Sequence, residues 1–142
     1  MHEMVSLLVA DDHAIMRERV VSTLETEFSV VGAVGDGQEM LDAESRVHPD
    51  VVVLDISMPT MNGIEAATRL KERDSKARII FLTVHEEPAF LKAAMAAGAI
   101  GYVIKSRLAS DLRLAVREAM AGRRFVSPSL TLTTCENGKK SE

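Results

Sequence analysis

The side chains best suited to chemistry in this sequence stand directly after short apolar runs. They are two adjacent carboxylates, a third carboxylate, a hydroxyl and an ammonium group: Asp11, Asp12, Asp55, Thr83 and Lys105. Crowded carboxylates repel one another, which raises the cost of ionising all of them, and a divalent cation removes that cost. Ligands that are all oxygen favour a hard ion, and Mg²⁺ takes few carboxylates while keeping several waters. The acidic residues therefore predict a Mg²⁺ site.

The hydroxyl and the ammonium group suit a tetrahedral oxyanion on the opposite side of such a metal ion. Phosphoryl transfer depends mostly on positioning and charge neutralisation, and a carboxylate can be its nucleophile. Asp55 is the best candidate for that nucleophile. It follows the run expected at the centre of the sheet, between the acidic pair and the side of Thr83 and Lys105. The set predicts phosphoryl transfer to Asp55.

The runs that carry these side chains are mostly rich in β-branched residues and nearly continuous in apolarity, which is typical of strands buried on both faces of a parallel sheet. Segments of helical period separate them, so the order is β-α repeated five times. Right-handed crossovers then predict an α/β fold, a doubly wound (βα)5 with a central five-stranded parallel sheet of order 2-1-3-4-5. That order brings the ends of strands 1, 3, 4 and 5 to one crevice. The strands are expected at residues 5–10, 29–34, 51–54, 79–82 and 101–104.

Length and composition exclude several classes of protein. The chain has 142 residues, 46% of them hydrophobic and 27% charged, which suits one globular domain and not a wholly disordered chain. Its net charge of −4 opposes a basic nucleic-acid surface. With the single cysteine Cys135 it has no intrachain disulfide framework, and we see neither a signal peptide nor a run long enough to span a membrane. A cytoplasmic protein without membrane partners is expected.

Several motifs, in order and each at a strand end, resemble the receiver domain of two-component response regulators. The resemblance covers about residues 4–121 and all five βα units, and it implies a flavodoxin-like, CheY-like fold. The matching motifs are Val9-Ala10-Asp11-Asp12-His13, Leu54-Asp55-Ile56-Ser57-Met58-Pro59 with Asn62-Gly63, Leu82-Thr83, and Gly98-Ala99-Ile100-Gly101-Tyr102-Val103-Ile104-Lys105.

The resemblance implies a phosphoacceptor and a metal site. Asp55 would accept a phosphoryl group from a sensor histidine kinase or a phosphotransfer protein. Asp11, Asp12 and Asp55 would hold Mg²⁺ together with the backbone carbonyl of Ser57.

The resemblance also implies a switch. Lys105 would pair with the phosphoryl oxygens, and the Thr83 hydroxyl would bond to the phosphoryl group and move toward it. Tyr102 would turn inward as Thr83 moves and so remodel the face of helix 4, strand 5 and helix 5. Ser57 and His85, two residues past Asp55 and Thr83, would tune the rate of dephosphorylation.

Smaller features resemble the NarL/FixJ branch of the family, in which a helix-turn-helix DNA-binding domain follows. They are Asp-Asp-His near the start, Thr-Val-His-Glu-Glu at 83–87, and residues 122–130. Here Glu142 ends the sequence without room for that domain. Ser106 follows Lys105 where many receivers have proline, which leaves the isomer of that peptide open. We expect a receiver domain at 1–121 and a tail or linker at 122–142.

The predicted function is a phosphorylation-switched signalling module, not a turnover enzyme, that controls an unidentified output partner or its own dimerisation. One alternative is an interaction scaffold independent of phosphorylation. Another is the receiver half of a truncated DNA-binding regulator, which would bind DNA only through the missing domain. An aspartyl-phosphate hydrolase ranks last. Enzymes of that class have an Asp-x-Asp motif, whereas here Ser57, not an aspartate, stands two residues after Asp55.

Taken singly, most of these residues have an ordinary structural explanation. Asp12 suits the N-cap of the first helix, Thr83 a β-strand, and Tyr102 core filling with its hydroxyl at the surface. The functional interpretation rests on all of them occurring together.

Overall fold

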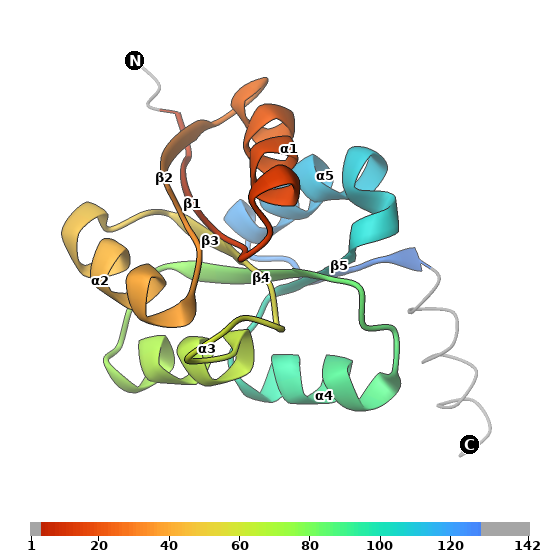
Figure 1. Cartoon of the computed structure of the whole chain (residues 1–142). Coiled ribbons are helices and arrows are strands. Elements are labelled where there is room, and N and C mark those ends of the chain that lie inside the picture. Colours follow the sequence, from red (N-terminus) through yellow and green to blue (C-terminus); the bar gives the residue numbers. More distant parts are fainter. Residues whose placement is uncertain (1–3, 129–142) are drawn as a thin grey trace.

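A parallel sheet with helices on both faces makes up the computed structural model, which describes residues 4–128 (Figure 1). The predicted doubly wound fold is confirmed, and the core of the sheet has the predicted order: the observed order is β2-β1-β3-β4-β5-β6. The elements are β1 Ser6–Ala10, α1 Ala14–Glu25, β2 Ser29–Val34, α2 Gly37–Val47, β3 Val51–Leu54, α3 Gly63–Glu72, β4 Arg78–Thr83, α4 Pro88–Ala96, β5 Gly101–Ile104, a 3₁₀ turn at Lys105–Arg107, α5 Leu108–Met120 and β6 Phe125–Val126.

The sheet has a sixth strand, where the sequence predicted five. Gly122, with φ of +80°, turns the chain back after α5, and β6 then pairs in parallel with β5. The Ser127 amide extends this pairing by donating to the Tyr102 carbonyl at 3.0 Å. The first part of the expected tail or linker therefore lies against the sheet. Its remainder, with Cys135, lies outside the described residues.

Two hydrophobic layers, one on each face of the sheet, explain why the strands read as continuous apolar runs. In β1, Leu7 and Val9 face the cluster that α1 and α5 cover, whereas Leu8 and Ala10 face the cluster under α2, α3 and α4 (Figure 1). All four side chains are buried. Because alternate residues enter opposite cores, every position of such a strand is apolar.

Side-chain caps mark the beginnings of two of the described α-helices, α2 and α3. Asn62 caps α3 by accepting from the Glu65 amide at 2.9 Å. At α1 the N-cap residue is His13 and has no side-chain cap, so the alternative of Asp12 as a helix cap is wrong. Between residues 4 and 128 every peptide bond is trans, including the one after Lys105.

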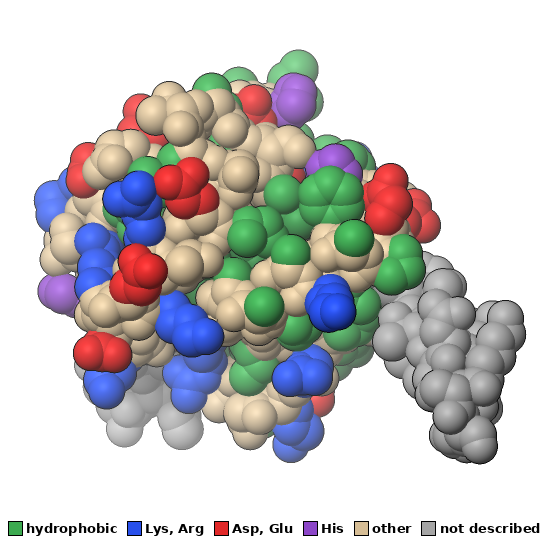
Figure 2. Space-filling model, turned by 90° about the horizontal axis from the view of Figure 1, so that it is seen from below, with side chains coloured by type: hydrophobic (Ala, Val, Ile, Leu, Met, Phe, Trp, Pro, Cys, Tyr) green, Lys and Arg blue, Asp and Glu red, His purple; other side chains and the backbone are tan. Residues whose placement is uncertain are grey.

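The face formed by α3 and α4 has an apolar part and a charged part. Figure 2 looks onto it and shows hydrophobic side chains gathered toward α4, with Lys and Arg side chains around them. Only Lys92 is charged among the nine residues of α4. In the part of the chain that the structure describes, no helix is long and apolar enough to cross a membrane.

Candidate functional site

Three of the predicted site residues meet at the carboxyl ends of the strands. Asp11 follows β1, Asp55 follows β3, and Lys105 follows β5. Lys105 Nζ lies 3.0 Å from Asp11 Oδ2 and 3.0 Å from Asp55 Oδ2. The parallel sheet brings these ends together although Asp11 and Lys105 lie 94 positions apart in the chain. One ammonium group therefore bridges two carboxylates.

Burial sets the electrostatics of this bridge. Asp11 and Asp55 are only 2% and 5% exposed. Burial raises the pKa of Asp55 above its usual value, against the opposing effect of the hydrogen bond and charge of Lys105. Burial alone would lower the pKa of Lys105, but its hydrogen bonds and charge pairing with Asp11 and Asp55 outweigh that effect and raise it. Two buried carboxylates thus share a single cation. When both are ionised, the group has a net negative charge, which favours the binding of a further cation.

Asp12 adds a third carboxylate at the edge of the bridge. The Asp11 side chain accepts from the His13 amide at 2.9 Å, and His13 Nδ1 lies 3.4 Å from Asp12 Oδ1. Ligand atoms of Asp11, Asp12 and His13 all lie within 4.8 Å of one another. This spacing and the oxygen-rich donor set fit a divalent cation. Asp12 and Ser57 also line one cavity of about 490 Å³, so these two of the four predicted ligands face a common space.

The predicted switch residues meet at the backbone of His85. Thr83 is fully buried, and its hydroxyl accepts from the His85 amide at 3.2 Å. Tyr102 is also fully buried; its hydroxyl donates to the His85 carbonyl at 2.9 Å, and its ring packs tilted against Phe81. Tyr102 thus lies inward, with its hydroxyl bonded inside the structure and not at the surface. Its predicted movement with Thr83 stays a prediction.

Tyr102 is the only tyrosine, and the chain has no tryptophan, so absorbance at 295 nm follows one hydroxyl. Burial, helped by the charge of Glu87, raises the pKa of Tyr102. We therefore expect the Tyr102 hydroxyl to ionise in the folded protein at a pH well above its pKa of about 10 in denaturant. Because the unfolded chain loses this proton first, stability falls as pH rises through and above about 10. Tyr102→Phe should lack this contribution, and titration of the folded protein near pH 10 would contradict it.

Three contacts around the site were not predicted. Ser57 Oγ lies 2.8 Å from His85 Nε2, and the ring of His85 stacks on Phe90. A Cβ on Gly63 would lie 2.0 Å from the Asp55 carbonyl oxygen, so α3 begins in close contact with the acceptor residue. The pair Asn62-Gly63 indicated only a turn. The stronger signal was Asn62 followed three residues later by Glu65, which is typical of a helix N-terminus.

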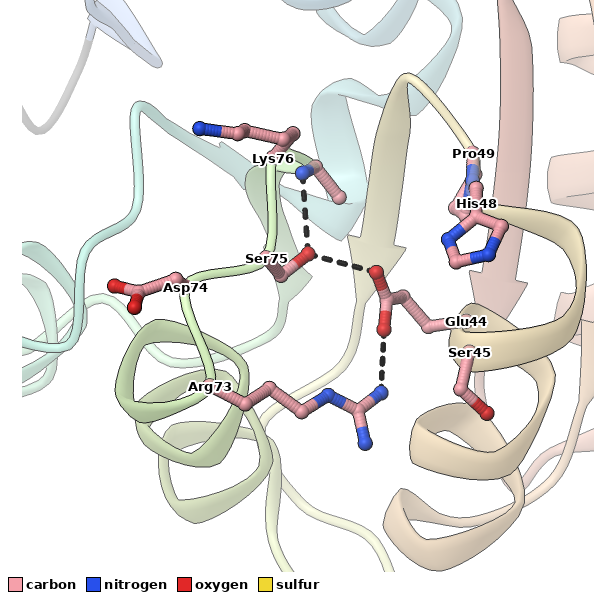
Figure 3. A pocket seen from close by; sticks show the side chains of 9 residues that line it. Glu44, Ser45, His48, Pro49, Arg73, Asp74, Ser75 and Lys76 are labelled. Carbon is pink, nitrogen blue, oxygen red and sulfur yellow. Dashed lines mark hydrogen bonds and ion pairs between the residues drawn. The ribbon is translucent and has the colours of Figure 1, made fainter.

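A second cavity, of about 340 Å³, lies at the opposite, amino-terminal ends of β3 and β4 (Figure 3). Its central group is the buried Glu44 carboxylate, which pairs with Arg73 and accepts from Ser75 Oγ at 2.7 Å. Ser75 Oγ in turn accepts from the Ala77 amide at 3.1 Å. These bonds tie α2 to the connection between α3 and β4, and they satisfy the buried charge. This cavity is therefore explained by structural contacts.

The model of the response regulator receiver domain matches residues 7–117, which run from within β1 to within α5 and include every strand end that positions the site. The chain belongs to the response regulator receiver domain family. It is similar to the probable transcriptional regulatory protein NarL of Mycobacterium tuberculosis, with 35% identity over 90% of this chain and 60% of the relative. The chain thus spans about 60% of the length of this curated relative. Such receiver domains are signalling modules and not turnover enzymes.

Two solved structures of response regulators share this architecture. A two-component response regulator of the LuxR family from Aurantimonas sp. SI85-9A1 matches with a TM-score of 0.91 and 34% identity, covering 99% of this chain and all of the other. The isolated receiver domain of RcsB from Salmonella enterica serovar Typhimurium, in the presence of the phosphomimetic BeF₃⁻, matches with a TM-score of 0.84 and 27% identity. It covers 92% of this chain and 97% of the other.

Proposed function

We propose that this receiver is switched by phosphorylation of Asp55. The observation that carries the proposal is the Lys105 ammonium group 3.0 Å from both Asp11 and Asp55, at the strand ends of a receiver fold. An Asp55 oxygen forms the bond to phosphorus while the bond from phosphorus to the donor atom breaks, and the donor keeps that electron pair. Lys105 then pairs with the phosphoryl oxygens. Because its ammonium group is already held at the buried carboxylates, the site needs little reorganisation during the transfer.

The proposed metal is Mg²⁺, held by the carboxylates of Asp11, Asp12 and Asp55 and the backbone carbonyl of Ser57. When bound, it would neutralise charge on the phosphoryl oxygens during transfer. The 4.8 Å cluster that includes Asp11 and Asp12 and the cavity that Asp12 shares with Ser57 support this assignment. His85 and Ser57, hydrogen-bonded beside the acceptor, are proposed to tune the rate of phosphoryl loss.

The proposed output uses Thr83 and Tyr102. Movement of the Thr83 hydroxyl toward the phosphoryl group would break its bond to the His85 amide and change the face of α4, β5 and α5. That face would bind the output partner or a second copy of the chain, and the apolar surface toward α4 supports such a contact (Figure 2). The proposed donor is a sensor histidine kinase or a phosphotransfer protein.

The test is intact-mass analysis after incubation with acetyl phosphate, with and without Mg²⁺. We expect the wild type to gain one phosphoryl group only with Mg²⁺, and Asp55→Asn to gain none. Asp42→Asn, which alters an exposed carboxylate of α2, is the matched control and should behave as the wild type. Uptake by Asp55→Asn at the wild-type rate would rule out Asp55 as the acceptor.

Two alternatives remain distinguishable. A wild type that takes up no phosphoryl group, but binds a partner unchanged, would support a phosphorylation-independent scaffold. The similarity to a transcriptional regulator that is longer than this chain favours a second reading, in which residues 1–121 are the receiver and 122–142 lead toward a DNA-binding domain. A longer natural protein that binds DNA more tightly after phosphorylation would support it.

A further inference from the structure

His85 is held at four points by groups from four separate segments: β4, β5, the loop after β3, and α4. Its amide donates to Thr83 Oγ1 and its carbonyl accepts from the Tyr102 hydroxyl. Its Nε2 atom lies 2.8 Å from Ser57 Oγ. Its ring stacks on Phe90, with centroids 4.0 Å apart and an angle of 15° between the planes. The backbone of His85 thus serves the switch residues, while its ring is placed by Ser57 and Phe90.

Phe90 is the more rigid of the two supports. It is the third residue of α4, its amide donates to the Glu87 carbonyl at 3.0 Å, and its side chain packs against the hydrophobic cluster under that helix. The bond between Ser57 and His85 is exposed, so water competes for both partners. Water cannot replace an aromatic stack in this way. The orientation of the His85 ring therefore depends mainly on Phe90.

The same contacts bridge two loops across the cavity beside Asp55. Ser57 belongs to the loop after β3, whereas His85 belongs to the loop after β4, and both line the cavity together with Phe90. A change at the start of α4 thus reaches the acceptor loop and Tyr102 through one residue.

We propose that Phe90 is a positioning residue of the switch: its ring holds His85 where the carbonyl keeps Tyr102 buried and the imidazole bridges to Ser57. The consequence for phosphorylation rests on the function proposed above, in which the inward position of Tyr102 accompanies activation. A contact that favours this arrangement also raises the affinity for a phosphoryl group, because ligand and contact select the same state.

Tyrosine fluorescence tests the structural part directly, because Tyr102 is the only tyrosine and no tryptophan obscures it. We expect Phe90→Leu, which keeps an apolar side chain but removes the ring, to raise acrylamide quenching of Tyr102 about twofold. Phe28→Leu is the matched control. Phe28 is buried in the cluster on the opposite face of the sheet, so this variant removes a phenyl ring that does not contact His85. Equal quenching of Tyr102 in the wild type and Phe90→Leu, or an equal increase in both variants, would overturn the proposal.

The functional part is tested by titrating BeF₃⁻ in the presence of Mg²⁺ and following its affinity by calorimetry. Phe90→Leu should bind about two- to tenfold more weakly than wild type, the range expected for loss of one aromatic pair. Phe90→Tyr, which keeps the ring, should restore the affinity, and Phe28→Leu should not lower it. Wild-type affinity in Phe90→Leu would show that the stack does not favour the phosphoryl-bound state.

The two proposals fail in different ways. If the wild type binds no BeF₃⁻ and takes up no phosphoryl group, the proposed function is wrong, and the quenching comparison still decides whether Phe90 positions His85. If the wild type binds BeF₃⁻ but Phe90→Leu matches it in both measurements, only the proposal for Phe90 is wrong.

Discussion

Replacing Gly63 by alanine should destabilise the protein by about 3 kcal/mol, a large effect for one methyl group. The added Cβ would lie 2.0 Å from the Asp55 carbonyl oxygen and 3.0 Å from the Ile56 Cα atom. Both neighbours are backbone atoms, so no side chain can rotate to make room. Either α3 or the loop after β3 must shift, and urea unfolding should show the loss as a lower midpoint.

The same substitution should impair the chemistry more than the loss of stability explains. Gly63 donates its amide to the Ile56 carbonyl at 2.7 Å, so the start of α3 holds the segment that directly follows Asp55. A displacement of about 1 Å at a reacting group costs on the order of a hundredfold in rate. We expect a loss of that size in phosphoryl uptake from acetyl phosphate, measured at a temperature where the variant remains folded.

Gly35→Ala is the matched control for this pair of measurements. A Cβ there would meet Arg17 and Glu39 side-chain atoms at 3.6 and 3.7 Å, which are ordinary contact distances. Its stability should stay the same or rise slightly, because alanine restricts the unfolded chain. Wild-type stability and wild-type phosphoryl uptake in Gly63→Ala would contradict the close approach between α3 and Asp55.

The strand ends were predictable because burial on both faces leaves a clear trace in sequence. Four of the five runs, those of β1, β3, β4 and β5, are nearly continuous in apolarity and strongly buried, whereas β2 is only partly buried. The polar residue at the end of each of these four runs marks the point where the strand leaves the core, as Asp55 does after β3. The topology then brings Asp11, Asp55 and Lys105 together without any detail of their side chains. This is why the acidic and basic parts of the site could be predicted from order alone.

The contacts that were not predicted depend on geometry that no periodicity records. The strand β6 has only two residues, and its pairing depends on the turn at Gly122 that returns the chain to the sheet edge. The stack of His85 on Phe90 depends on where α4 begins, and the requirement for glycine at position 63 depends on how closely α3 approaches β3. Such features follow from packing between elements, and packing is absent from a linear pattern.

Removal of the shared cation is the second large effect, and we expect Lys105→Met to cost about 3 kcal/mol near neutral pH. The ammonium group is the partner of both Asp11 and Asp55, and its side chain is only 9% exposed. Without it, burial and the charge of Asp11 are opposed only by the backbone hydrogen bond from Ile56, so the pKa of Asp55 rises further. A buried carboxyl with a raised pKa destabilises the fold as pH rises through that value. The stability difference from wild type should therefore shrink as the pH is lowered.

A double variant separates this electrostatic effect from lost packing. Asp55→Asn removes one of the two repelling charges, so Lys105→Met should cost markedly less in that background than alone. Added Mg²⁺ should stabilise Lys105→Met more than wild type, because the metal would supply the missing positive charge. Lys92→Met changes an exposed lysine of α4 and should alter neither the stability nor the stabilisation by Mg²⁺. An equal cost of Lys105→Met in both backgrounds would mean that Lys105 contributes through packing and not by neutralising Asp55.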